Sequence, residues 1–172
     1  MVLNMDLILG IYKRMEKIKI VLEKEGAKIP VRAHDGDAAY DLYTPEDIVL
    51  TNGRSIIDLG FAIELPRNLA ATIQPRSGFA SKGMEVLDRR GSGNKYRIDA
   101  DVVRGLVDSC YRGHVGVIIN VREPNAQYYV LPKGTRIAQM QIVVVPETEF
   151  EEVEKLSKTD RATNGYGSTG AK

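Results

Sequence analysis

The sequence predicts an all-β domain, a sandwich or barrel built from short strands. Short apolar runs rich in strand-forming residues recur along the chain, and turn residues separate them at close intervals. No long helical pattern alternates with these runs, which argues against a parallel sheet of β-α units. The 172 residues, with 43% hydrophobic and 27% charged side chains, are sufficient for one domain with a buried core.

The ordered domain is expected to begin near Met15. Residues 1–14 show only a loose helical spacing of apolar side chains, whereas residues 17–20 alternate lysine with isoleucine at strand period. We therefore interpret 1–14 as an N-terminal extension without an assigned role and 15–150 as a β-barrel domain. Residues 151–172 are expected to form a C-terminal arm, because a polar, glycine-rich ending supplies no core.

The strands follow one another with few residues between them. The candidates are residues 39–43, 55–58, 61–65, 70–74, 102–108, 114–121, 128–131 and 136–145. The wholly β-branched run 142–145 predicts a strand buried on both faces or one at a subunit interface. The polar segment 88–95 contains two glycines and is typical of a surface loop or hairpin tip.

Charge and composition restrict the ligand classes. Lysine plus arginine is 24 and aspartate plus glutamate is 23, a net charge of +1 that argues against sequence-independent nucleic-acid binding. An anionic ligand would have to be bound by a few placed residues. One cysteine and two histidines exclude a disulfide within the chain and a multi-cysteine zinc site. With no membrane span or secretion signal recognised, we expect a soluble cytoplasmic protein.

The C-terminal tail contains the residue types of a phosphate-binding loop. Its glycines leave backbone N–H groups accessible, and Ser168 and Thr169 add hydroxyl donors. Arg161 adds a permanently charged planar fork, and the Tyr166 ring can stack on a base. A solvated chain terminus is the alternative for such a segment.

Arg76 and Ser77 begin a predicted turn after a strand that ends at Pro75. Exposed N–H groups, a guanidinium and a hydroxyl in such a turn can bind phosphate, although an ordinary turn with a surface arginine has the same composition. The sequence contains neither a P-loop nor a glycine-rich Rossmann motif.

Residues 101–108 form an apolar run that is interrupted by Arg104 and Gly105, and they predict a β-hairpin with a positive φ at the glycine. In the tightest such hairpin Asp101 and Asp108 would lie opposite each other, an unfavourable pairing of like charges. Asp108 is expected to be partly buried and able to act as a base. The alternative is a pair of solvated acids at strand ends.

Three more polar residues stand within or near apolar runs. Asp41 and Gln139 each interrupt a predicted strand, and a buried carboxylate or amide needs a polar partner from the backbone or from a ligand. Tyr111 follows the predicted hairpin and is either a packed strand residue or part of a site.

Five segments contain these residues in a fixed order: 38–43, 75–78, 105–113, 134–140 and 161–170. Together they resemble the five ordered motifs of the trimeric dUTPase family, and the resemblance runs from about Met15 to Gly170. It implies a jelly-roll-like β barrel, a homotrimer whose active sites are shared between subunits, and Mg²⁺-dependent hydrolysis of dUTP to dUMP and pyrophosphate. That reaction limits uracil in DNA and supplies dUMP for dTMP synthesis.

The resemblance also implies a role for each matched residue. Asp108 would be the catalytic base, and Asp41 would act on Mg²⁺ through water. Tyr111 would pack under the deoxyribose, and Tyr166 would stack on the uracil. The residues expected to bind the phosphates are Arg76, Ser77, Gly78, Gln139, Arg161, Ser168 and Thr169, and the backbone around Val102, Gly105 and Leu106 would bind the uracil.

The chain departs from the family pattern at a few positions. Cys110 stands where an aspartate is common, His114 stands where an acid or amide is common, and the segment 85–101 is longer than expected. Two alternatives remain: a dCTP deaminase-type or bifunctional relative, and a dUTPase-fold protein that binds a regulator, for which residues near Arg89 and Arg90 are candidates. No particular regulatory partner follows from the sequence.

Overall fold

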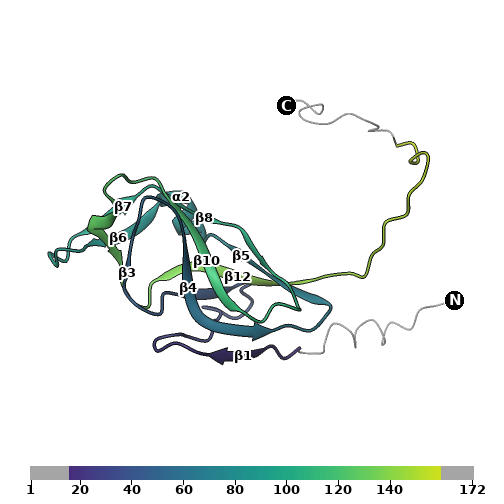
Figure 1. Cartoon of the computed structure of the whole chain (residues 1–172), viewed down its shortest axis with the longest axis horizontal. Coiled ribbons are helices and arrows are strands. Elements are labelled where there is room, and N and C mark those ends of the chain that lie inside the picture. Colours follow the sequence, from purple (N-terminus) through teal and green to yellow (C-terminus); the bar gives the residue numbers. More distant parts are fainter. Residues whose placement is uncertain (1–15, 160–172) are drawn as a thin grey trace.

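A computed structural model describes residues 16–159 of the chain, and Figure 1 shows their arrangement. They fold almost entirely as antiparallel β-structure, which confirms the predicted fold class. The elements are β1 (Lys19–Leu22), β2 (Tyr40–Tyr43), β3 (Ile48–Val49), β4 (Gly53–Glu64), β5 (Leu69–Gln74), α2 (Ser77–Lys82), β6 (Met84–Asp88), β7 (Lys95–Ile98), β8 (Ala100–Val103), β9 (Gly105–Val107), β10 (His114–Val121), the 3₁₀ turn η1 (Ala126–Tyr128), β11 (Tyr129–Leu131) and β12 (Arg136–Val144).

The strands form three four-stranded sheets. Their orders are β1-β4-β10-β8, β3-β11-β6-β7 and β2-β12-β5-β9. Neighbouring strands are frequently distant in sequence, as in a jelly roll, so each sheet joins early and late parts of the chain. The third sheet gathers matched segments, because β2, β12 and β9 contain parts of segments 38–43, 134–140 and 105–113, and β5 ends directly before segment 75–78.

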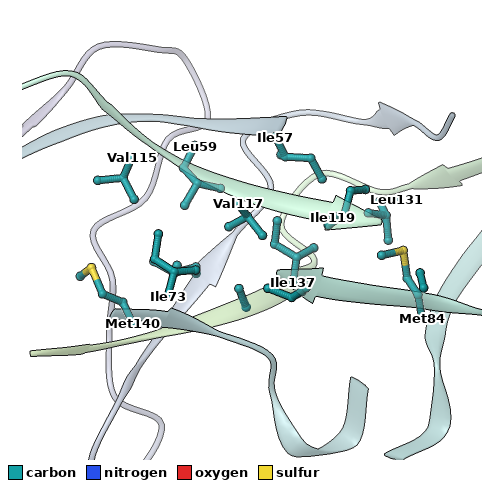
Figure 2. Close-up of a cluster of buried hydrophobic side chains, with 14 of the residues drawn as sticks. Ile57, Leu59, Ile73, Met84, Val115, Val117, Ile119, Leu131, Ile137 and Met140 are labelled. Carbon is teal, nitrogen blue, oxygen red and sulfur yellow. The ribbon is translucent and has the colours of Figure 1, made fainter. Parts of the chain in front are cut away.

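The core lies between the sheets, and alternating side chains supply it. Every second residue of β10 is buried, including Val117 and Ile119, which are both 0% exposed. Figure 2 shows these residues facing Ile73, Ile137 and side chains of the other strands. Asp41 and Thr44 are the buried polar residues in the described part of the chain.

Strand β4 is longer than the sequence predicts. The two candidates 55–58 and 61–65 are one strand, and the break expected between them is an irregularity within it. His114 pairs with Ala62 and Gly116 pairs with Asp58, so two extra residues of β4 are accommodated in between. Gly60 supplies the required backbone conformation with a φ of 72°.

The predicted hairpin at 101–108 is wrong. β8 pairs with β10 and β9 pairs with β5, so the chain crosses from one sheet to another at Arg104. The φ of Gly105 is not positive. Each short strand extends the edge of a different sheet, and this arrangement buries both Val102 and Val107 in the core.

Two loops resolve into regular structure. The turn predicted at Arg76 is the start of α2, which ends where the N–H of Gly83 donates to the carbonyl oxygen of Phe79. The polar segment 88–95 lies at the tip of the β6–β7 hairpin, as predicted. The unexpectedly long segment 85–101 therefore contains most of the β6–β7 hairpin, which lies at the edge of the second sheet.

The chain leaves the sheets after β12. Val144 is 74% exposed, so the prediction that the β-branched run 142–145 is buried on both faces is wrong for a single chain. Residues 145–159 contain no helix or strand and extend away from the sheets in Figure 1. Within 16–159, no helix is long and apolar enough to cross a membrane.

Candidate functional site

The buried Asp41 carboxylate is the centre of an ion-pair cluster. Its Oδ1 lies 2.9 Å from Nε of Arg76, and its Oδ2 accepts a hydrogen bond of 3.2 Å from Nη1 of Arg136. The carboxylate side chain is 10% exposed, whereas the Arg76 side chain is 32% exposed. Asp41 thus holds two guanidinium groups in place while part of each remains accessible to a ligand.

Strand register brings the cluster together. Gln139 in β12 pairs with Asp41 in β2 on one side and with Gln74 in β5 on the other. Gln139 also donates from Nε2 to the carbonyl oxygen of Pro75 at 3.2 Å. This hydrogen bond connects β12 to the residue directly before Arg76. The predicted need of Gln139 for a polar partner is therefore met by backbone.

Thr44 fixes the end of β2 to the start of β12. It is fully buried, and its hydroxyl donates to the carbonyl oxygen of Pro132 at 2.7 Å and accepts from the N–H of Thr135 at 2.9 Å. The N–H of Gly134 donates to the carbonyl oxygen of Thr44. This network holds Arg136, the next residue along the chain, in reach of Asp41.

The cluster opens onto a cavity of about 540 Å³, whose lining includes Asp41, Arg76, Ser77, Gly78, Arg136 and Gln139. Among these residues are two guanidinium groups, a hydroxyl and an amide, and Gln74 adds a second amide. The first N–H groups of α2 have no partner within the helix. These are the donors that an anionic group such as a phosphate requires.

The structure adds residues that the sequence did not single out. Arg136 donates to Asp41 at 3.2 Å, and its place in segment 134–140 was the only sequence signal for it. Arg76 and Arg136 also border a second cavity of about 330 Å³, to which Lys82 and Arg97 contribute. Arg97 belongs to the β6–β7 hairpin, so the added hairpin brings a cation to this side of the cluster.

Asp108 and Tyr111 line a different cavity, of about 260 Å³, together with Gly105 and Leu106. Within one chain this cavity shares no lining residue with the one at Asp41. Asp108 is exposed here, contrary to its expected partial burial, because it follows the last residue of β9 at the edge of a sheet. Tyr111 is 47% exposed and outside any strand, so it is not a packed strand residue.

Val102 is buried and lines a cavity of about 350 Å³ beside Pro75 and Ala80. It therefore lies apart from Gly105 and Leu106, with which the sequence grouped it. Arg161, Tyr166, Ser168 and Thr169 lie outside the described residues.

His114 lies between two carboxylates. Its Nδ1 is 2.9 Å from Oδ2 of Asp58, and its Nε2 is 2.6 Å from Oε2 of Glu23. Hydrogen bonds to Asp58 and then to Glu23 raise the pKa of His114 above its ordinary 6.5. Burial alone would raise the pKa of Asp58, but hydrogen bonds from His114, the Gly60 N–H and Lys24 lower it to about 2.

The side chains of residues 16–159 do not form a dedicated metal cage. No group of three or more histidine, cysteine, aspartate or glutamate side chains there is arranged to hold an ion. Both oxygens of Asp41 are bound to arginines. This donor set fits a Mg²⁺ ion that arrives bound to the oxygens of a phosphate ligand and to water, since Mg²⁺ retains several waters in such sites.

Solved structures resemble this fold. A Staphylococcus bacteriophage 80alpha dUTPase with bound dUpNHpp is 25% identical, with a TM-score of 0.74 over 91% of this chain and 99% of that one. A dUTPase from phage phi11 of S. aureus, described with a structural Mg(II) ion, is 23% identical, with a TM-score of 0.67 over 81% of this chain and 98% of that one.

Sequence relatives cover nearly the whole chain. The deoxyuridine 5'-triphosphate nucleotidohydrolase of Clostridium tetani is 42% identical over 156 residues, which are 89% of this chain and 96% of that protein. The enzyme of the same name from Crocosphaera subtropica is 38% identical over 155 residues, 90% of this chain and 99% of that protein. Residues 25–170 match the family model described as dUTPase. The chain belongs to the dUTPase family.

Proposed function

We propose that this protein hydrolyses dUTP to dUMP and pyrophosphate. The observation that supports this most directly is the meeting of Asp41, Arg76 and Gln139, from three matched segments, at one anion-binding cavity. The curated relatives are named deoxyuridine 5'-triphosphate nucleotidohydrolases. The physiological result would be removal of dUTP before it enters DNA, with dUMP left for dTMP synthesis.

The phosphate groups would bind at Arg76 and Arg136. Their guanidinium groups are held by Asp41 before substrate arrives, so little reorganisation is needed when negative charge develops on the phosphate oxygens. Ser77, Gly78 and the amide of Gln139 would complete the donor set. Mg²⁺ would enter with the triphosphate and neutralise part of its charge, and Asp41 would position the arginines.

The reaction would begin with a water molecule oriented by Asp108. The carboxylate accepts a proton as the water oxygen forms a bond to the α-phosphorus. The bond from that phosphorus to the oxygen bridging the α- and β-phosphates breaks, and pyrophosphate leaves with both electrons of that bond. Tyr111 would pack against the deoxyribose, where it leaves no room for a 2′-hydroxyl group.

The active site would be assembled from several subunits of a homotrimer. Asp108 and Arg76 border different cavities in one chain, so a neighbouring copy can supply the missing half of each site. Exposed apolar side chains are consistent with such contacts: Ile56 is 72% exposed, Leu106 is 64% exposed and Val144 is 74% exposed. The tail with Arg161, Tyr166, Ser168 and Thr169 would close over the bound nucleotide.

A nucleotide panel tests the proposal. With Mg²⁺ present, the purified protein should release pyrophosphate from dUTP and far less from dCTP, dTTP or UTP. Ammonia release from dCTP would instead indicate a deaminase, and nucleotide binding without turnover would indicate a regulatory binding protein. Either result would reject the proposed activity.

A further inference from the structure

His114 connects three separate parts of the chain. It is the first residue of β10, and its ring contacts Asp58 in β4 and Glu23 in the turn after β1 at 2.9 and 2.6 Å. A neutral imidazole has only one N–H donor, so it can donate to one of these carboxylates but not to both. With both carboxylates ionised, both contacts are hydrogen bonds only in the imidazolium form, in which both ring nitrogens donate.

The segment 108–113, which precedes His114, has few other attachments. Its hydrogen bonds in the described structure are local: the N–H of Tyr111 donates to the backbone carbonyl oxygen of Asp108, and Arg112 donates to the carbonyl oxygens of Ser109 and Tyr111. The Tyr111 hydroxyl donates to the carbonyl oxygen of His114 at 3.2 Å. Thus β9 holds the segment at one end and His114 holds it at the other.

Gly113 makes this closed arrangement possible. A Cβ atom at this position would collide with the Tyr111 hydroxyl group, which reaches back across the glycine to His114. The Tyr111 ring therefore packs against the backbone of Gly113, the residue directly before His114. Asp108, Tyr111 and His114 border the same cavity.

We propose that His114, held as an imidazolium between Asp58 and Glu23, is a positioning residue that fixes Asp108 and Tyr111 for catalysis. The anchoring stands on the geometry above, and its catalytic consequence rests on the proposed function. The histidine itself touches neither substrate nor the attacking water in this scheme. It acts through the backbone of the segment that ends at its own carbonyl group.

The charges around His114 favour protonation. Glu23 and Asp58 face its two ring nitrogens, and Lys24 shares Asp58 at 2.9 Å. On its own segment, Asp108 lines the same cavity, and Arg112 is bound to local carbonyl oxygens. Because the pKa of His114 is raised in the folded state, the anchor is complete below about 6.5 and is lost as the pH rises through the raised value. The pKa of Asp58 is lowered to about 2, so its carboxylate remains ionised while His114 titrates.

The test is Glu23→Gln, which removes one carboxylate and leaves the other contacts of the loop intact. Lys19→Gln is the matched control, because it breaks an exposed ion pair between β1 and β4 that does not contact His114. NMR titration of the histidine rings and hydrogen exchange of the amides at 109–113 are measured on the full chain without nucleotide. The kcat/KM for dUTP is then followed from pH 6 to pH 9.

We expect Glu23→Gln to lower the pKa of His114 and to speed exchange at 109–113 by about fivefold or more at pH 8. Its kcat/KM should begin to fall at a lower pH than that of wild type or of Lys19→Gln. The proposal is overturned if exchange at 109–113 is unchanged, or if the pH profile of an active enzyme does not move. If wild type does not turn over dUTP, the proposed function fails, and the exchange data still decide whether His114 anchors the segment.

Discussion

The Nε atom of Arg76 lies 2.9 Å from Oδ1 of Asp41, a buried carboxylate whose other oxygen is bound to Arg136. A carboxylate in this position fixes the orientation of the arginines and partly offsets their mutual repulsion. Both effects depend on the planar guanidinium, which can keep one N–H on Asp41 while other N–H groups face the cavity.

Arg76→Lys is expected to lower kcat/KM for dUTP by about 10²-fold, since an ammonium is a point charge without the fork geometry that bridges Asp41 and a phosphate. Steady-state kinetics with Mg–dUTP measure the effect. Arg122→Lys is the control, because Arg122 pairs with Asp99 and Asp101 outside this cavity. Equal losses in both variants would contradict the role assigned to Arg76.

Asp41→Asn should cost stability as well as activity. It leaves two guanidinium groups beside a neutral amide in a largely buried position, and the lost charge-assisted hydrogen bonds are worth about 1–3 kcal/mol. Urea unfolding measures the loss. A variant as stable as wild type would show that the cluster does not stabilise the fold.

Sequence patterns predicted the strands well where one face of each is buried. β10 alternates buried and half-buried residues along its whole length, and its bounds 114–121 agree with the prediction. The sequence pattern divides β4 into 55–58 and 61–65, whereas the sheet accommodates Gly60 within an irregularity of one strand. Which glycines end a strand depends on pairing across the sheet, and one strand's sequence does not contain that information.

The site was predictable only as separate pieces. Asp41, Arg76 and Gln139 were singled out in sequence, and strand register then explains why they meet. Arg136 was missed, because an arginine at the start of a strand looks like an ordinary solvated cation until its partner is known. The hairpin predicted at 101–108 is wrong for a related reason: β8 pairs with β10 and β9 pairs with β5, in two different sheets.

The core supplies a test of the fold itself. Ile119 is 0% exposed and lies among buried side chains from several strands, as Figure 2 shows. Ile119→Ala should destabilise the protein by about 2–5 kcal/mol through lost burial and the cavity that remains. Val21→Ala, at a position 57% exposed in β1, is expected to change the free energy of unfolding far less. Similar losses in the two variants would place Ile119 outside the core.

Tyr111 offers a test of sugar selectivity. If its ring excludes a 2′-hydroxyl group, Tyr111→Ala should raise the ratio of UTP to dUTP turnover by roughly tenfold or more. Tyr111→Phe keeps the ring and loses only the hydrogen bond to His114, so it should preserve the discrimination. Unchanged selectivity in the alanine variant would exclude the proposed packing against deoxyribose.

Subunit mixing tests whether the active site is shared. Asp108→Asn should nearly abolish turnover by removing the base, and Arg76→Ala should do so by removing a phosphate ligand. Because the two residues border different cavities in one chain, a site built between subunits can take Asp108 from one variant and Arg76 from the other. Random mixing of equal amounts of the two inactive proteins by refolding should then restore about a quarter of the sites, since each site needs one particular variant at each of two positions. Refolding each variant alone is the control. A mixture as inactive as its components would contradict a shared site. Either both residues then act within one subunit, or the subunits do not assemble. The mass of the refolded particle distinguishes these two cases.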